Sequence, residues 1–334
     1  MKVDLSKTVG LEGMQYLSEA APGGLEGLED SEDIETVEID SGLEGTGKVK
    51  VLVSKPESFE GRQGYQPNFL DGWTIPLPKP LAARADDVRR LRRGGQGIEL
   101  KYEHFSTVQS ISRRMPMFVA VNIDGSKSRK IVRTSTPWRF DGRLDVADQI
   151  GDEVYSEENN VLDRGHMVRR EDPVWGAMTT AARANVDTFH FTNATPQMAA
   201  VNQRTWLGLE DYILRNTRED AMAVTVFTGP CFTDDDFPYR GALIPKRFWK
   251  VVAVVTEDGR PSATAYEVSQ EDELSALEFV FGAYKTFQIS IHEIEEKTSL
   301  SFGDLSLFDG FSVTERRTGL RNRIKLESLE MVRV

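Results

Sequence analysis

The sequence predicts an α+β fold with a mixed, largely antiparallel central sheet and flanking helices. Two observations predict it. Asp124-Gly125 and Asp258-Gly259 separate neighbouring strand-like runs, and such pairs are typical of the tight turns of antiparallel hairpins. Helical patterns are interspersed with these hairpins, and this mixed order favours an α+β arrangement.

Strands are expected where residues run apolar or alternate in polarity. The expected strands are 49–53, 102–108, 117–123, 223–228, 247–256, 262–267 and 288–291. We expect 247–256 and 262–267 to pair as one hairpin. Strand 117–123 should form another with 127–133, across the first Asp-Gly turn.

Three helices are expected. In 82–93 the acidic residues come early and the arginines late, in agreement with the helix dipole, and Gly94-Gly95 ends the pattern. In 201–215 large apolar residues recur on one side. The third helix is expected over 274–284.

Residues 1–60 differ from the rest of the chain in charge. They hold 5 lysines, no arginine and 14 acidic residues, which makes −9 of the total of −12. Such an acidic, Gly-rich composition buries little apolar surface. We therefore predict a flexible or regulatory segment over 1–60 and one folded domain over 61–334, whose arginine-rich stretch 84–143 allows a basic face.

Several classes of protein are disfavoured by composition. The single cysteine, Cys231, permits no internal disulfide and no cysteine-based zinc site. No run approaches the roughly 20 apolar residues that cross a bilayer, and the first 20 residues lack the apolar core of a secretory signal. We expect a soluble, cytoplasmic protein without a membrane partner.

Chemistry-bearing residues gather in LDRGHMVRRED, 162–172. Cleavage of a phosphodiester needs a base for water, cations for the phosphate, and a Lewis acid or proton for the departing oxygen. His166 suits the first task because an imidazole titrates near neutral pH. Arg164 can face the same phosphate if the segment is extended, and Gly165 permits close backbone approach. Taken alone, a histidine is more often structural.

A second group lies within 189–214. Asn202 offers a neutral carbonyl oxygen that suits magnesium. Glu210, eight residues on, lies about 12 Å along the same helix face and could hold a metal-bound water. Taken alone, Asn202 is better explained as a helix cap, Glu210 as a solvated surface residue and Asn193 as a turn residue.

Three motifs occur in order along the chain. They read Asp-Arg-Gly-His at 163–166, Thr-Asn-x-x-Pro-Gln at 192–197, and Asn-Gln-x-x-Trp-x-x-Leu-Glu at 202–210. This set resembles the DNA/RNA non-specific endonuclease family, whose metal site is built on a ββα element. The resemblance extends from about Leu100 to Phe308.

The resemblance implies a role for each motif residue. His166 corresponds to the general base, and Asn202 to the one direct protein ligand of Mg²⁺. Glu210 corresponds to the acid that orders metal-bound water, Arg164 to the arginine at the phosphate, and Asn193 to an asparagine that supports the site.

Further expectations follow from the same resemblance. A second phosphate-binding arginine precedes the histidine motif in the family, and Arg139 is the first candidate here, with Arg143 the fallback. The expected reaction is metal-dependent, sequence-non-specific hydrolysis of DNA, RNA or both to 5′-phosphate products. Mn²⁺ is the alternative to Mg²⁺, and a homodimer is expected because family members are often dimers.

Other readings stay open at this point. The main alternative is a regulated or inactive nuclease-like protein that only binds nucleic acid or a partner. Serine hydrolases are disfavoured because no Gly-x-Ser-x-Gly elbow occurs, and a zinc enzyme is disfavoured by four scattered histidines. Residues 1–60 could cover a basic site, dock a regulatory partner, or act only as a solubilising tail.

Overall fold

The computed structural model describes most of the chain. The described residues are 33–40, 48–155, 162–199, 207–271 and 285–326. Contacts divide the chain into a short unit, Met1–Asp30, and a large unit, Ser31–Val334.

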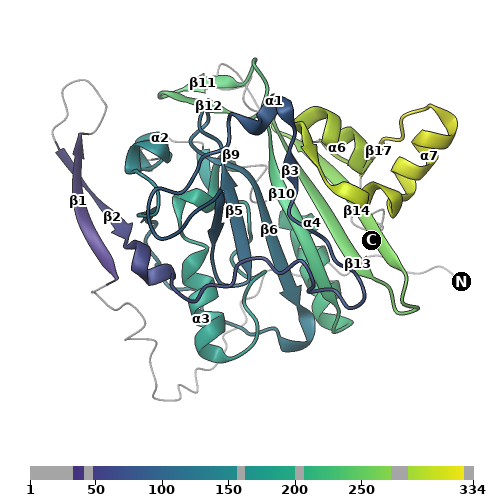
Figure 1. Ribbon diagram of the computed structural model, residues 1–334, viewed down its shortest axis with the longest axis horizontal. Helices are drawn as coiled ribbons and strands as arrows, with labels where there is room; N and C mark the ends of the chain where they lie inside the picture. Colours follow the sequence, from purple (N-terminus) through teal and green to yellow (C-terminus); the bar gives the residue numbers. More distant parts are fainter. Residues whose placement is uncertain (1–32, 41–47, 156–161, 200–206, 272–284, 327–334) are drawn as a thin grey trace, which may run out of the picture. The chain divides into compact units, whose positions relative to one another are not determined.

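An eight-stranded sheet forms the centre of the large unit (Figure 1). Its order is β17-β15-β14-β13-β10-β6-β5-β4, and every neighbouring pair in it is antiparallel. The strands are β4 (Glu99–Lys101), β5 (Phe105–Gln109), β6 (Pro116–Asp124), β10 (Ala223–Cys231), β13 (Arg247–Val255), β14 (Pro261–Ser269), β15 (Lys285–Ile289) and β17 (Ile324–Lys325). The predicted α+β class with a largely antiparallel sheet is confirmed.

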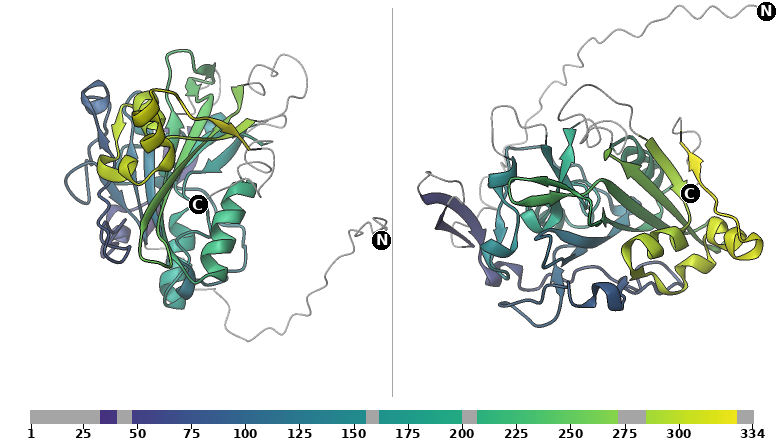
Figure 2. Two further views of the ribbon diagram at one scale, coloured as in Figure 1. Left: turned by 90° about the vertical axis from the view of Figure 1, so that its right-hand side faces the viewer. Right: turned by 90° about the horizontal axis from the view of Figure 1, so that it is seen from above.

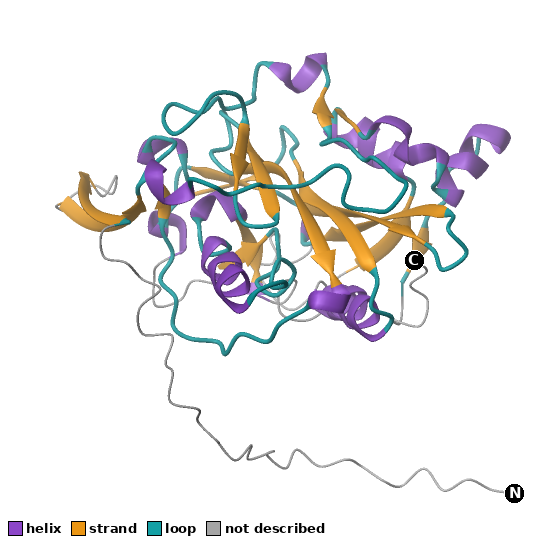
Figure 3. Ribbon diagram, turned by 60° about the horizontal axis from the view of Figure 1, so that its bottom comes forward, coloured by secondary structure: helices purple, strands orange, loops and turns teal. Residues whose placement is uncertain are grey.

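Both faces of the sheet are covered. All nine residues of β6 are buried, and they alternate between two apolar cores, with Phe118 and Ala120 in one and Val119 and Val121 in the other. Helix α4 (Leu207–Glu219) contributes to one core and α6 (Ile291–Thr298) to the other. The helices accordingly lie on opposite sides of the strands (Figures 2 and 3).

The remaining described elements are short. They are β1 (Ile34–Asp40), β2 (Lys48–Ser54), η1 (Pro56–Phe59), β3 (Lys79–Pro80), α1 (Ala82–Ala85), η2 (Gly125–Lys127), β7 (Phe140–Asp141), η3 (Val146–Asp148), α2 (Asp152–Tyr155), β8 (Leu162–His166), α3 (Met178–Asp187), η4 (Phe191–Asn193), β9 (Ala194–Met198), β11 (Phe237–Tyr239), β12 (Ala242–Ile244), β16 (Leu300–Ser301), η6 (Gly303–Leu307) and α7 (Gly310–Thr318).

One predicted hairpin is confirmed and the other is wrong. β13 pairs with β14 across the Asp258-Gly259 turn. After β6, however, the Asp124 side chain accepts a hydrogen bond from the backbone of η2, and the chain then runs to Arg139 outside any named strand. A Cβ on Gly125 would lie 1.8 Å from the Thr217 carbonyl oxygen, so this glycine serves close packing against α4.

The helix predictions had mixed outcomes. The helix expected over 82–93 ends at Ala85, because the following backbone bonds to β5 and its neighbour instead of to itself: Arg89 N donates to Gln109 O at 2.8 Å and Ile111 N to Asp87 O at 2.7 Å. The helix expected over 201–215 corresponds to α4 from Leu207, and its first six residues lie outside the described ones. The helix expected over 274–284 also lies outside them.

The strand predicted at 49–53 is confirmed as β2, and it packs on the body of the domain. β2 pairs in parallel with β7, and Val53 is buried. Phe59 is 7% exposed, with the Arg143 guanidinium 3.7 Å from its ring centroid. The large unit thus includes residues that composition assigned to the N-terminal segment. No helix in the described ranges is long and apolar enough to cross a membrane.

Replacing Phe59 with alanine tests whether this segment belongs to the folded core. Phe59→Ala should lower the free energy of unfolding by about 3 kcal/mol, because it removes a buried ring and leaves a cavity. The measurement is urea unfolding. As a control, Val49→Ala on β2, where Val49 is 45% exposed, should stay within about 0.5 kcal/mol of wild type. Equal stability of all three proteins would show that this segment contributes nothing to the core.

Candidate active site

The paired strands β8 and β9 position the sequence motifs. They run antiparallel, with His166 opposite Ala194 and Gly165 opposite Thr195. A Cβ on Gly165 would meet the Gln197 side chain at 2.2 Å, and Gln197 is fully buried. A side chain at position 165 would therefore clash with the paired strand, so the glycine of the Arg-Gly-His string allows β8 and β9 to pack together.

Asn193 secures the backbone that follows His166. Its side-chain oxygen accepts from Val168 N at 2.8 Å, and its amide nitrogen donates to the Val168 and Thr188 carbonyls at 3.0 Å each. Met167 N also donates to Asn193 O at 2.9 Å. Asn193 is fully buried, so these bonds fix the exit of β8 without solvent competition.

A cavity of about 730 Å³ opens beside this element. Its described lining is Arg133, Trp138, Asp163, Arg164, His166, Arg169, Arg170, Glu171, Phe189 and Glu210. The cavity thus brings together His166, Arg164 and Glu210 of the predicted site. Four arginines against three acidic residues give its lining a net positive formal charge, although the whole chain is acidic.

The His166 ring is enclosed by aromatic residues. Its centroid lies 4.7 Å from Trp138 and 5.1 Å from Phe189, the latter edge-on. Nε2 is buried and has no hydrogen-bond partner among the described residues. Burial, and to a smaller extent the positive charges of Arg133 and Arg170, together lower the pKa of His166 to about 3. The imidazole is therefore uncharged at neutral pH.

Arg164 reaches the cavity under partial restraint. Its Nε donates to Asp152 Oδ1 at 3.1 Å, and its guanidinium carbon lies 5.3 Å from the Tyr155 ring centroid. Arg164 and Asp152 side chains are 29% and 56% exposed, so solvent weakens this pair. The guanidinium can exchange the carboxylate for a phosphate at small cost.

Glu210 belongs to a buried group of charges. Lys250 Nζ donates to Glu210 Oε1 at 3.2 Å and to Thr228 Oγ1 at 3.1 Å. Asp172 lies close enough for its charge to be felt: burial raises the pKa of Asp172 to about 7, with Lys250 opposing the shift and Glu210 adding to it. Neither Lys250 nor Asp172 was singled out from the sequence.

Neither of the two upstream arginines expected from the sequence is among the described residues that line this cavity. Arg139 is buried, its backbone bridges to His190, and it is not in the described lining. Arg143 makes a buried ion pair with Asp141 at 2.7 Å and donates to the Lys101 carbonyl at 2.8 Å.

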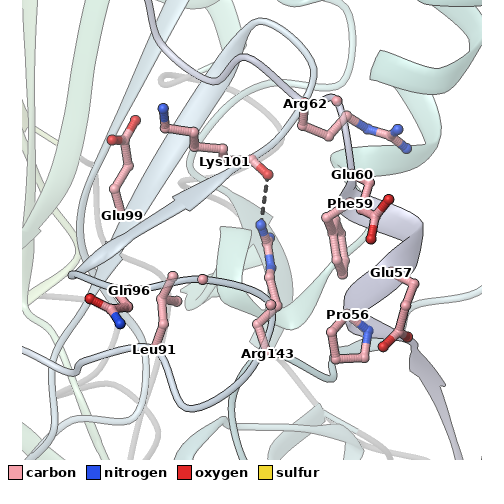
Figure 4. A pocket seen from close by; sticks show the side chains of 13 residues that line it. Pro56, Glu57, Phe59, Glu60, Arg62, Leu91, Gln96, Glu99, Lys101 and Arg143 are labelled. Atoms are coloured by element: carbon pink, nitrogen blue, oxygen red, sulfur yellow. Dashed lines mark hydrogen bonds between the residues drawn. The ribbon is translucent and has the colours of Figure 1, made fainter.

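Arg143 instead lies in a second pocket of about 420 Å³, which shares no described lining residue with the first (Figure 4). Arg133 is the upstream arginine that lines the His166 cavity. No hydrogen bond or ion pair holds it among the residues that the structure describes. Sequence inspection missed Arg133 because it lies in an extended stretch without a motif.

The direct metal ligand expected from the sequence, Asn202, lies outside the described residues, between β9 and α4 in chain order. Within the described part of the chain, no group of three or more His, Cys, Asp or Glu residues could hold a metal ion. Magnesium keeps several waters in its coordination shell and therefore needs few protein oxygens. The Glu210 carboxylate on the cavity wall is one such oxygen group.

The other histidines and the cysteine have structural surroundings. His190 is buried and its Nε2 lies 2.9 Å from Ser54 Oγ. His104 stacks on Trp175 at 3.4 Å. Cys231 is buried, and burial raises the pKa of its thiol to about 12, which leaves it unreactive.

Comparison with known proteins gives a family match. Residues 89–307 match the model of the DNA/RNA non-specific endonuclease family. The chain is 40% identical over 266 residues to an uncharacterised protein, y4fB, of Sinorhizobium fredii, covering 74% of this chain and 40% of that protein.

Two named relatives are more distant. The nuclease of Serratia marcescens is 28% identical over 175 residues, covering 49% of this chain and 59% of the nuclease. Human mitochondrial endonuclease G is 29% identical over 155 residues, covering 42% of this chain and 48% of that protein. The matches thus span between two fifths and three fifths of the lengths of these relatives.

A solved structure shares the fold. A chain from the crystal structure of the EndoG/EndoGI complex, titled for the mechanism of EndoG inhibition, superposes with a TM-score of 0.50 at 18% identity. The superposition covers 63% of this chain and 87% of that one. The resemblance stated from the three motifs is confirmed at the level of family and fold.

Proposed function

The chain belongs to the DNA/RNA non-specific endonuclease family, and from that premise we propose that it hydrolyses phosphodiester bonds of DNA, RNA or both with little sequence preference, leaving 5′-phosphate products. The observation that carries the proposal is the His166 cavity. One wall holds an uncharged imidazole, and the same cavity holds four arginines and the Glu210 carboxylate.

His166 acts as the general base in this proposal. An uncharged imidazole accepts the proton of the attacking water. A phosphate in the cavity adds negative charge beside the ring and partly offsets Arg133 and Arg170, which raises the pKa of His166 toward the working pH. Asn193 contributes by fixing the backbone just after His166.

The arginines bind the phosphate. Arg164 takes the role expected from its motif, and we assign the upstream role to Arg133 in place of Arg139. A guanidinium matches the planar geometry of two phosphate oxygens and stays charged at every working pH. These groups stabilise the negative charge that grows on the phosphate as water attacks.

Mg²⁺, with Mn²⁺ as the alternative, would be held directly by Asn202 and through water by Glu210, and when bound it supplies a Lewis acid for the phosphate and the departing 3′ oxygen. The oxygen groups present fit such an ion. A homodimer, a cytoplasmic location and a regulatory role for residues 1–60 stay predictions from the sequence.

The first test is cleavage of supercoiled plasmid DNA and of structured RNA by wild type and His166→Ala. Wild type should degrade one or both with Mg²⁺ and neither with EDTA. His166→Ala should be slower by about 10²–10⁴-fold, the usual contribution of a general base. His292→Ala, at a half-exposed histidine outside the cavity, is the matched control and should cleave normally. An inactive wild type, or an active His166→Ala, would contradict the proposal.

The pH profile tests the state of His166. Its pKa of about 3 leaves the imidazole uncharged down to acidic pH, so kcat/KM should not fall with a midpoint near 6.5 as the pH decreases from 8 to 5. Asp172, whose pKa is about 7, could add a step of its own, and Asp172→Asn removes it. A midpoint near 6.5 that persists in Asp172→Asn would show that His166 titrates normally.

Exchanging Arg133 for alanine tests the upstream assignment. Arg133→Ala should lower kcat/KM by at least about tenfold and reduce the slope of log(KM) against log(salt) by about one, because one phosphate contact is lost. Arg260 is 80% exposed and lies outside the cavity lining. Arg260→Ala should therefore change neither kcat/KM nor the salt dependence of KM. If Arg139→Ala lost activity at unchanged stability while Arg133→Ala did not, the original assignment to Arg139 would be right.

A further inference from the structure

Lys250 is unusual in its position. It lies in the middle of β13, a central strand, and is 1% exposed. Its neighbours on the same face, Phe248 and Val252, belong to an apolar core. A lysine in such surroundings loses its hydration, and removing an ammonium from water is costly unless a partner compensates.

One charged partner is Glu210, the residue of α4 that lines the cavity. Lys250 Nζ lies 3.2 Å from Glu210 Oε1, and Thr228, opposite Lys250 on β10, accepts a second hydrogen bond at 3.1 Å. The Lys250 and Glu210 side chains are 2% and 9% exposed. A buried ion pair of this kind seldom stabilises a fold more than apolar residues of the same shape, so its presence calls for another explanation.

The geometry gives that explanation. The hydrogen bond from Lys250 holds one oxygen of the carboxylate, and Oε2 receives no hydrogen bond from the residues that the structure describes. Glu210 also lines the His166 cavity. The Lys250 ammonium is thus fixed on a central strand. It holds one oxygen of the Glu210 carboxylate and leaves the other available at the cavity.

We propose that Lys250 is a positioning residue that orients the Glu210 carboxylate toward the water shell of a divalent cation in the His166 cavity. The inference rests on the proposed function. Lys250 acts through Glu210 and touches neither nucleic acid nor the reacting atoms. Outer partners of this kind typically change metal affinity or activity by about 10–100-fold when they are removed.

The test measures Mn²⁺ binding without nucleic acid, by electron paramagnetic resonance of the free ion, in the full chain. Lys250→Met keeps the apolar stem and removes the charge, and it should raise the Mn²⁺ dissociation constant by about 10–100-fold. Glu210→Gln should show a similar loss. The double variant should lose no more than Glu210→Gln alone, because coupled residues are not additive. If Lys250→Met lowered the Mn²⁺ affinity equally in the wild-type protein and in Glu210→Gln, the proposal would be overturned.

Folding is controlled in two ways. Thermal unfolding without metal shows which variants fold. If Lys250→Met does not fold, Thr228→Val replaces it in the Mn²⁺-binding test. Loss of the Thr228 hydrogen bond loosens Nζ and should weaken Mn²⁺ binding by about fivefold. Lys297→Met is the matched control, because Lys297 pairs with buried Glu293 at 2.7 Å but lies outside the cavity lining. It should bind Mn²⁺ as wild type does.

The remaining outcomes separate the inference from the proposed function. Wild-type Mn²⁺ affinity in the folded Lys250→Met or Thr228→Val proteins would overturn the positioning role, whether or not wild type cleaves plasmid DNA. A wild type that binds Mn²⁺ but cleaves nothing would remove the proposed function, while weaker binding in the variants would still support the positioning role. A wild type that binds no Mn²⁺ would overturn the inference.

Discussion

The pairing of β8 with β9 is the constraint on which the site depends. It sets His166 opposite Ala194, and it succeeds only because Gly165 leaves space for the Gln197 side chain. The Asn193 side chain then bonds both backbone groups of Val168, so the chain leaves β8 in one direction. Precise placement of a catalytic group needs such a rigid support. Motif residues that look catalytic in the sequence are thus partly structural.

Electrostatics in the cavity follow from this placement. The turn after β8 contributes Arg169 and Arg170, and the loop before β7 contributes Arg133, so cations from distant parts of the chain surround an uncharged histidine. Their charge attracts phosphate and, together with burial, lowers the pKa of His166. Burial is the main reason why the base is uncharged, and the same arginines that attract the substrate favour the uncharged state as well. An overall charge of −12 does not oppose this, since local potential governs binding in a cleft.

Much of the fold and part of the site could be predicted from the sequence. Mainly apolar runs located β6, β10 and the β13–β14 hairpin, because these strands are long and almost wholly buried. The motifs identified His166, Arg164 and Glu210, which the structure brings to one cavity. The helix over 82–93 failed because contacts with β5 outweigh local propensity. Arg133 could not be found, since its role depends on where a loop lies and no local pattern encodes that.

Lys250 shows how a departure from a local pattern can indicate function. In RFWKVVAVV, a single lysine interrupts a run that is otherwise apolar after its first residue. Read alone, it suggests a solvent-facing position on a half-exposed strand. Because both faces of the sheet are covered, no position in the middle of β13 reaches solvent, and the lysine must find its partner inside. Natural sequences break such local rules mainly at functional sites. One partner that it finds is Glu210, the carboxylate of α4 that lines the His166 cavity among the residues described there.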